Sequence, residues 1–230
     1  MKIKKTFGRC LISTFILITQ QITLNSLKPH EEWWTFNVPL IPETLNNWLG
    51  DADATSRVFA RDYIKKTNYK TILDVPCGTC VDYLAFKRDC STIDYTGLDI
   101  TEILVSQARN YGANAHKGSI EAIPFPDSSF DVVYSRHILE HLSYYNAAIN
   151  ELIRVAAKEV FIIFFIIPSS EPDQIERTED RKAILYHNHY NKEMLEQAIM
   201  NNRKVKSISW DYLGDTNCGQ ETILHIYINS

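Results

Sequence analysis

The sequence predicts an α/β domain with a doubly wound, mostly parallel sheet and helices on both of its faces. Three observations lead to this fold class. Strand-like and helix-like segments alternate between residues 71 and 229. An uninterrupted apolar run fills residues 160–167, as in a central parallel strand that helices cover on both faces. A turn containing a glycine follows the first predicted strand, where doubly wound sheets bind their ligands.

The predicted elements follow from the periodicity of the apolar residues. Helices are predicted at residues 55–65, 80–88, 101–111, 143–157 and 191–200. Seven strands are predicted at residues 71–75, 94–100, 113–118, 131–135, 160–167, 205–212 and 223–229. The charge-rich residues 171–181 are expected to form a solvated loop.

Length and charge limit the possible functions. A chain of 230 residues suits one medium domain, expected at residues 55–230, behind a segment 31–54 that serves as a lid or linker. The formal net charge is -4, and no basic block follows the first nine residues, so a nucleic-acid partner is not expected. The five cysteines are scattered and odd in number, which favours a reducing compartment.

Residues 1–30 have the profile of a targeting or membrane-associated segment. Four basic residues precede the apolar run 10–19, and no acidic residue appears before Glu31. An apolar run of this length matches a signal-peptide core and falls short of the roughly 20 residues that cross a bilayer. Export or tethering, organelle import and an inert N-terminal helix are all compatible with the pattern.

The first strand-to-helix turn has the features of a ligand site. The strand carries Asp74 to the edge of the sheet, and Pro76, Cys77 and Gly78 follow before a helix begins. Gly78 has no Cβ to obstruct a ligand, and the free N–H groups of a helix N-terminus can bind a carboxylate. A tight structural turn would explain the same residues equally well.

A second acidic residue strengthens the case for a nucleotide-like ligand. Asp99 ends the second predicted strand, 21 residues after Gly78. A carboxylate about 20 residues beyond a glycine turn is placed to bind the ribose hydroxyls of an adenosine-containing ligand. A third strand then ends at Gly118, a proline-rich loop follows, and a fourth strand ends at Ser135.

With these motifs, residues 70–170 resemble the class I methyltransferases, which have a seven-stranded Rossmann-like fold, and within them the methyltransferase type 11-like subfamily. The segment Pro124–Asp131, with the sequence PFPDSSFD, belongs to the same signature. The resemblance implies a methyltransferase that uses S-adenosyl-L-methionine as its cofactor. It places the protein on the cytoplasmic side, with possible membrane contact through residues 1–30, because this cofactor is made in the cytosol.

The resemblance also implies a role for each residue of the cofactor site. Asp74 and the backbone of Pro76, Cys77 and Gly78 would hold the methionine part. Asp99 would bind the ribose and Ile100 would flank the adenine. Adenine contact would fall to the Ser119 hydroxyl or the Ile120 backbone, because the family usually has an acidic residue where Ser119 stands; Ser135 completes the expected site. Pro76 and Cys80 stand where many relatives have glycine, and Pro76 removes one backbone donor from the turn.

The acceptor side of the site is less defined. A sulfonium cofactor already activates its methyl group, so the protein mainly has to align the acceptor. His137 and His141 follow the fourth strand and could take a proton from an acceptor, or could simply pack a short helix. Residues 186–190 form a possible substrate-side cluster whose histidines show no metal-binding spacing, and no metal is predicted. The aromatic residues of segment 31–54 suggest a small-molecule or lipid-like acceptor.

Two other functions fit parts of the sequence. Cys77 and Cys80 form a Cys-x-x-Cys pair at a strand-to-helix junction, as in thiol–disulfide redox proteins, where a helix N-terminus lowers the pKa of the first cysteine. Such a pair could also make a methyltransferase sensitive to oxidation. A cofactor-binding domain without catalysis is the third alternative, suggested by Ser119 and by the altered glycine positions.

Overall fold

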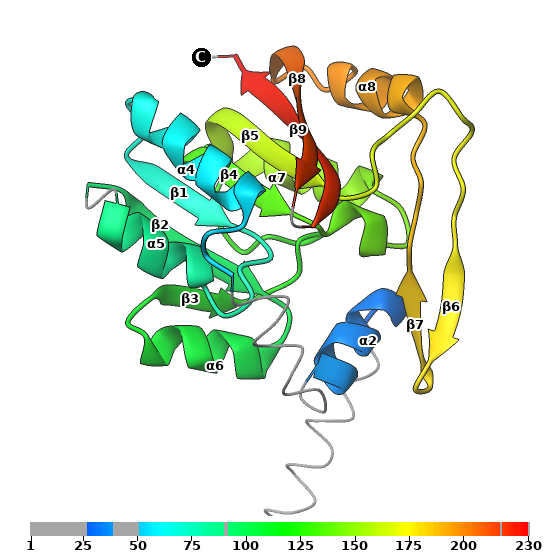
Figure 1. Ribbon diagram of the computed structural model, residues 1–230, viewed down its shortest axis with the longest axis horizontal. Helices are drawn as coiled ribbons and strands as arrows, with labels where there is room; N and C mark the ends of the chain where they lie inside the picture. Colours follow the sequence, from blue (N-terminus) through cyan, green and yellow to red (C-terminus); the bar gives the residue numbers. More distant parts are fainter. Residues whose placement is uncertain (1–26, 39–50, 90–91, 217, 230) are drawn as a thin grey trace, which may run out of the picture.

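The computed structural model describes residues 27–38, 51–89, 92–216 and 218–229. Its main feature is a seven-stranded sheet in the order β3-β2-β1-β4-β5-β9-β8 (Figure 1). The first five strands in this order are parallel, and β9 runs antiparallel to both β5 and β8. This confirms the predicted fold class. The strands are β1 (Thr71–Asp74), β2 (Asp94–Asp99), β3 (Asn114–Lys117), β4 (Phe130–Arg136), β5 (Ala156–Phe164), β8 (Val205–Thr216) and β9 (Gly219–Ile228).

Helices cover both faces of the sheet because every central strand is apolar on both sides. On β5, Val160 and Ile162 join the core under α7 and α8, while Phe161 and Ile163 join the core under α4, α5 and α6. The helices are α4 (Thr55–Lys66), α5 (Val81–Asp89), α6 (Glu102–Asn110), α7 (Asn146–Val155) and α8 (Lys192–Met200).

The structure differs from the prediction at the junction between α7 and β5 and in the loop expected at residues 171–181. Residues 156–157, expected at the end of a helix, begin β5, where Ala156 is paired with Phe130 of β4. The expected loop 171–181 contains β6 (Arg177–Asp180), which pairs with β7 (Ala183–Tyr186). The residues between these strands, Arg181 and Lys182, both have positive φ, as in a two-residue hairpin turn. Charged residues on an exposed hairpin leave no apolar alternation, so the sequence pattern indicated a loop.

The helix α2 (Pro29–Asn37) lies outside the sheet and beside β7 (Figure 1). Proline starts the helix at a position where its missing N–H costs nothing, and the Lys28 N–H donates to Glu31 Oε2 at 2.8 Å. The Trp33 indole N–H donates to Asp180 Oδ2 of the hairpin at 3.0 Å. α2 therefore spans the boundary expected between segments 1–30 and 31–54.

Most of the predicted targeting segment and Trp48 lie outside the described residues. Among the residues that are described, no helix is both long enough and apolar enough to span a bilayer.

Candidate functional site

The turn after β1 is held by the end of β2. Gly78 has a φ of 54°, in the left-handed region that favours glycine. Its N–H donates to Asp99 Oδ2 at 2.9 Å, and the Thr101 N–H donates to Asp99 Oδ1 at 2.8 Å. Burial raises the pKa of Asp99, although these hydrogen bonds oppose the rise. The Asp99 carboxylate thus fixes the glycine turn at the carboxyl edge of the sheet.

A small pocket lies beside Asp99, and we call it the edge pocket. Its volume is about 30 Å³, the space of about one water molecule. Strand ends and turns form one side, and one face of α2 closes the other. The lining residues are His30, Glu31, Trp34, Val75, Pro76, Leu98, Asp99, Ile100, Gly118, Ser119, Ile120, Ile138 and Leu142.

The structure brings together part of the predicted cofactor site. The residues of that prediction that line the edge pocket are Pro76, Asp99, Ile100, Ser119 and Ile120.

The other predicted cofactor residues are buried next to the pocket. Gly78 does not line the pocket, but its N–H donates to the pocket-lining Asp99. Asp74, Cys77 and Ser135 are buried without lining the pocket, and the Ser135 hydroxyl has no hydrogen-bond partner among the residues that the structure describes. Sequence reasoning missed His30, Glu31 and the apolar wall, because their positions in the chain give no sign that α2 folds onto this edge.

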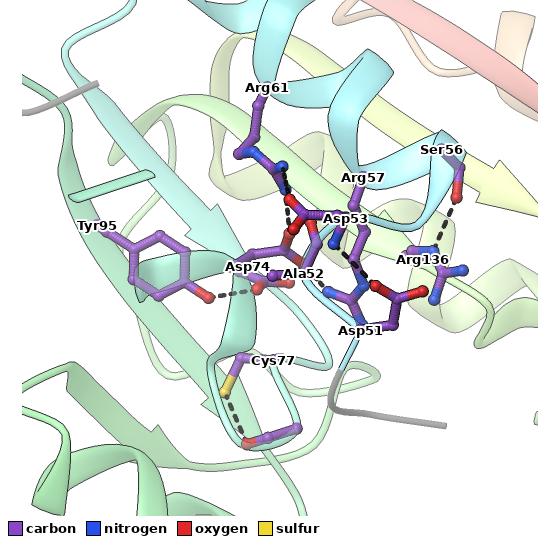
Figure 2. Close-up of polar contacts among 12 residues, drawn as sticks. Asp51, Ala52, Asp53, Ser56, Arg57, Arg61, Asp74, Cys77, Tyr95 and Arg136 are labelled. Carbon is purple, nitrogen blue, oxygen red and sulfur yellow. Dashed lines mark hydrogen bonds and ion pairs between the residues drawn. The ribbon is translucent and has the colours of Figure 1, made fainter. Parts of the chain in front are cut away.

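Asp74 belongs to a buried network of charges (Figure 2). The Tyr95 hydroxyl donates to its Oδ2. Arg57 and Arg61 of α4 form ion pairs with Asp82 of α5 below the turn. Burial and the neighbouring Asp82 charge raise the pKa of Asp74, although Tyr95 and Arg57 oppose the rise. The two arginines were not expected from the sequence, because they share an amphipathic helix with residues that face solvent.

Cys77 and Cys80 lie side by side as free thiols beneath the turn. A Cβ on Gly97 would fall 2.6 Å from Cys80 Sγ and 2.8 Å from Cys77 Sγ, so β2 needs glycine at this point. The hydrogen bond with Cys80 and burial raise the pKa of the Cys77 thiol. The lowered pKa expected of a redox cysteine is therefore wrong for Cys77, since a buried thiol with a raised pKa is a poor nucleophile.

His137 lies directly after β4 and is paired with a buried carboxylate. Its φ is 54°, an uncommon backbone conformation for a residue with a side chain. Its Nε2 is 2.6 Å from Glu221 Oε1, which also accepts from the Ser56 hydroxyl at 2.7 Å and pairs with Arg136. Burial opposes ionisation of Glu221, yet hydrogen bonds from His137, Thr216 and Ser56 hold its pKa at about 2. A carboxylate can only accept, so His137 carries its proton on Nε2.

His141 lies in an aromatic cluster. Its Nδ1 donates to the Tyr186 carbonyl at 2.7 Å, which leaves Nε2 as the basic atom. Its ring centroid lies 5.3 Å from that of Trp34, 5.2 Å from Phe165 and 5.1 Å from His187. Burial lowers the pKa of His141 to about 4, and burial lowers that of His137 to about 4 as well. Both imidazoles are therefore neutral at pH 7.

Glu140 supports this cluster from below. Its Oε1 accepts from the N–H groups of Phe165 at 2.9 Å and Ile166 at 3.3 Å, while the Asn188 N–H donates to its carbonyl at 2.9 Å. Burial raises the pKa of Glu140 to about 7. Glu140 thus ties the segment after β4 to residues 165–166 through its carboxyl group and to Asn188 through its backbone carbonyl.

Comparison with known proteins agrees with this geometry. Residues 73–164 match a family described as methyltransferase domains. The matched segment is thus identified as a methyltransferase domain, and the fold is that of a solved SAM-dependent methyltransferase structure. This confirms the family and the fold that the sequence predicts, and S-adenosyl-L-methionine is the methyl donor of class I methyltransferases.

Relatives of the methyltransferase domain are distant. The uncharacterized methyltransferase YcgJ of Bacillus subtilis is 31% identical over 94 residues, 38% of this chain and 37% of YcgJ. Ajmaline N-methyltransferase of Rauvolfia serpentina is 34% identical over 105 residues, 41% of this chain and 35% of that enzyme. The chain therefore spans little more than a third of these curated relatives. A SAM-dependent methyltransferase structure from Methanosarcina mazei superposes with a TM-score of 0.56 at 15% identity, covering 73% of this chain and 96% of that one.

The histidines considered for metal binding do not gather around one point. Across the described ranges, the group of three potential ligands that converges is His30, Glu31 and Glu121, whose ligand atoms lie within 4.8 Å of one another. The Lys28 ammonium nitrogen lies 2.8 Å from Glu121 Oε2 in this group. The Lys28 ammonium group thus already supplies, next to Glu121, the positive charge that a metal ion would bring to this group of three residues.

We predict that the buried histidines make the domain less stable in acid. Between about pH 6.5 and pH 4, His141 is protonated in the unfolded chain but not in the folded chain. The free energy of unfolding therefore decreases as the pH is lowered through this range. The loss from one such group is roughly 3 kcal/mol. Urea unfolding at several pH values measures this loss. Between about pH 6.5 and pH 4, the free energy of unfolding of wild type should decrease by this much more than that of His141→Phe, in which an aromatic ring still fills the site.

The contribution of Glu140 runs in the opposite direction, since its raised pKa makes the protein less stable as pH rises from about 4.5 to about 7. It is present in both proteins and cancels in their difference. Replacement of the exposed His189 is the matched control for the loss of a histidine. Parallel curves for wild type and His141→Phe would contradict the prediction.

Proposed function

We propose that this protein is an S-adenosylmethionine-dependent methyltransferase that acts on a small-molecule or lipid-like acceptor. The observation that carries the proposal is the Asp99 carboxylate. It ends β2, is fixed by the N–H groups of Gly78 and Thr101, and lines the edge pocket with Ile100 and Ser119. A carboxylate at this edge of a doubly wound sheet is placed to accept hydrogen bonds from ribose hydroxyls.

The described residues fit the cofactor in their chemistry. Asp99 would bind the ribose, and Ile100 and Ile120 offer apolar surface to the adenine on the two sides of the pocket. The turn Pro76–Gly78 would lie against the methionine part, with the buried Asp74 behind it. When bound, the cofactor supplies an activated methyl group, so the chain has to bind it, orient the acceptor and exclude water.

We assign the acceptor side to the aromatic cluster around His141. Trp34, Phe165 and His187 surround its imidazole, and burial keeps that imidazole neutral. Flat rings of this kind suit an apolar or aromatic acceptor. The net charge of -4 also suits a small molecule better than a polyanion.

The two predicted histidines would have different roles. His141 Nε2 is free to accept a proton from an acceptor hydroxyl or amine, because Nδ1 is held by the Tyr186 carbonyl. His137 Nε2 is held by Glu221, so its Nδ1 is the basic atom. A histidine whose proton is fixed by a second group keeps one tautomer, which is what a proton acceptor needs.

We further propose that the protein acts on the cytoplasmic side of a membrane, in contact with it through residues 1–30. The support is the sequence pattern of Lys2, Lys4, Lys5 and Arg9 before an apolar run. Basic residues near an anionic bilayer contribute about 1 kcal/mol each.

Asp99→Asn should weaken binding of S-adenosylhomocysteine about a hundredfold in titration calorimetry, because it removes a charged acceptor of two hydroxyl hydrogen bonds. Asp94→Asn, at the exposed start of the same strand, is the matched control and should bind as wild type does. Thermal melting checks that each variant is folded. Failure of wild type to bind, or equal binding by Asp99→Asn, would refute the cofactor assignment.

A transfer assay tests the acceptor class. Incubation with methyl-labelled cofactor and a cell extract should place label in the fraction of small molecules and lipids, and Asp99→Asn should abolish it. Label found in protein or nucleic acid would show that the acceptor class is wrong.

Membrane contact predicts that the full chain co-sediments with vesicles that contain phosphatidylserine and less with vesicles of phosphatidylcholine alone. Replacement of Lys2, Lys4, Lys5 and Arg9 by glutamine should remove the difference. Equal sedimentation of both proteins with both vesicles would contradict this proposal.

A further inference from the structure

One wall of the edge pocket comes from a part of the chain outside the sheet. His30, Glu31 and Trp34 of α2 line the same pocket as Asp99 and Ser119. In Figure 1, α2 lies beside the β6–β7 hairpin, and its Trp33 packs in one cluster with Leu104 of α6 and Ala183 of β7. A helix that joins the pocket from outside can contribute residues to ligand recognition that the sheet itself lacks.

Two residues of this wall, His30 and Trp34, each have a buried nitrogen without a hydrogen-bond partner in the described residues, and only an imidazole nitrogen can act as an acceptor. His30 is 2% exposed, and its Nε2 lies 3.0 Å from Glu121 Oε2. The same carboxylate oxygen lies 2.8 Å from the Lys28 ammonium nitrogen. Burial raises the pKa of Glu121, but the hydrogen bonds from His30 and Lys28 outweigh it and hold the pKa below its usual value. Glu121 is therefore ionised and accepts, so Nε2 carries the proton of His30.

The other nitrogen of His30 is then a buried acceptor. Nδ1 has no hydrogen-bond partner within the described residues. Leaving a buried polar atom unpaired costs free energy, so such an atom calls for an explanation. Here the atom belongs to a pocket-lining side chain, and the missing partner would be a hydrogen-bond donor.

On the sheet side of the pocket, the side-chain acceptors of Ser119 and Glu121 are already engaged. Ser119 stands where an acidic residue is usual in the resembled family, and its hydroxyl already accepts from the Glu121 N–H at 3.2 Å. The Glu121 carboxylate next to it is engaged by His30 and Lys28. Adenine presents an amino group, which is a donor and needs an acceptor.

We propose that His30 recognises the adenine amino group of the cofactor, its Nδ1 acting as the acceptor that the Ser119 position lacks. The inference rests on the proposed function, since it assumes an adenosine ligand in the edge pocket. α2 is then a part of the cofactor site, and the hydrogen bond from His30 Nε2 to Glu121 orients the imidazole for this contact.

The size of the pocket adds a requirement for movement. With α2 in place the pocket measures about 30 Å³, whereas small-molecule sites measure roughly 300 Å³ or more. The cofactor therefore requires α2 to move away from the sheet, and α2 then rests against the bound nucleoside. Recognition of the amino group takes place in that arrangement, through a residue that the moving helix carries.

The test compares two ligands that differ at one position of the purine. S-adenosylhomocysteine carries the amino group, and S-inosylhomocysteine carries an oxygen there. Calorimetry on the full-length wild type should show a preference for the adenosine ligand. His30→Phe keeps a ring in place and removes the acceptor, so it should reduce that preference about tenfold, the effect of one hydrogen bond.

Lys28→Met is the matched control, because it weakens the attachment of α2 to Glu121 and leaves His30 in the pocket. It should change the binding of both ligands by the same factor. An equal loss of both ligands in His30→Phe, or no preference in wild type, would overturn the inference while leaving the cofactor assignment intact. Failure of wild type to bind either ligand would instead overturn the proposed function.

Discussion

The site depends on one buried carboxylate that joins two successive β–α units. Asp99 belongs to β2, yet it accepts hydrogen bonds from Gly78 in the turn after β1 and from Thr101 before α6. Burial makes an unpaired charge costly, so these bonds hold the turn and the strand end in a single arrangement. The Gly78 backbone can take part because its left-handed φ costs a glycine little. The geometry of the cofactor edge follows from this constraint.

Buried charged groups organise the opposite end of the site in a similar manner. Glu221 of β9 binds Ser56 of α4, Arg136 at the end of β4 and His137 directly after it. Glu140 binds the backbone N–H groups after β5. Glu221 has partners from several elements and Glu140 has two backbone N–H partners, which reduces the cost of burying each carboxyl group. The histidines between them stay neutral. The acceptor side is thus held by polar contacts rather than by packing alone.

The sequence predicted the sheet well because its strands are buried on both faces and its turns carry characteristic residues. It also located Asp99 and Ile100, since their spacing from Gly78 is a property of the chain. It could not show that α2 and the β6–β7 hairpin fold onto this edge, because polar hairpin residues and a short helix lack periodicity. Glu221 was missed for a related reason: its partners lie on α4 and β4, far away in sequence.

The position of α2 has a thermodynamic consequence. A helix that fills the proposed ligand site in the free chain must move before the ligand binds, so the apparent affinity equals the intrinsic affinity multiplied by the fraction of molecules in which the helix is displaced. Contacts remote from the ligand then set that fraction. The bond between the Trp33 indole and Asp180 of the hairpin is one such contact. Affinity for the cofactor could thereby be adjusted through residues of the hairpin that never touch it.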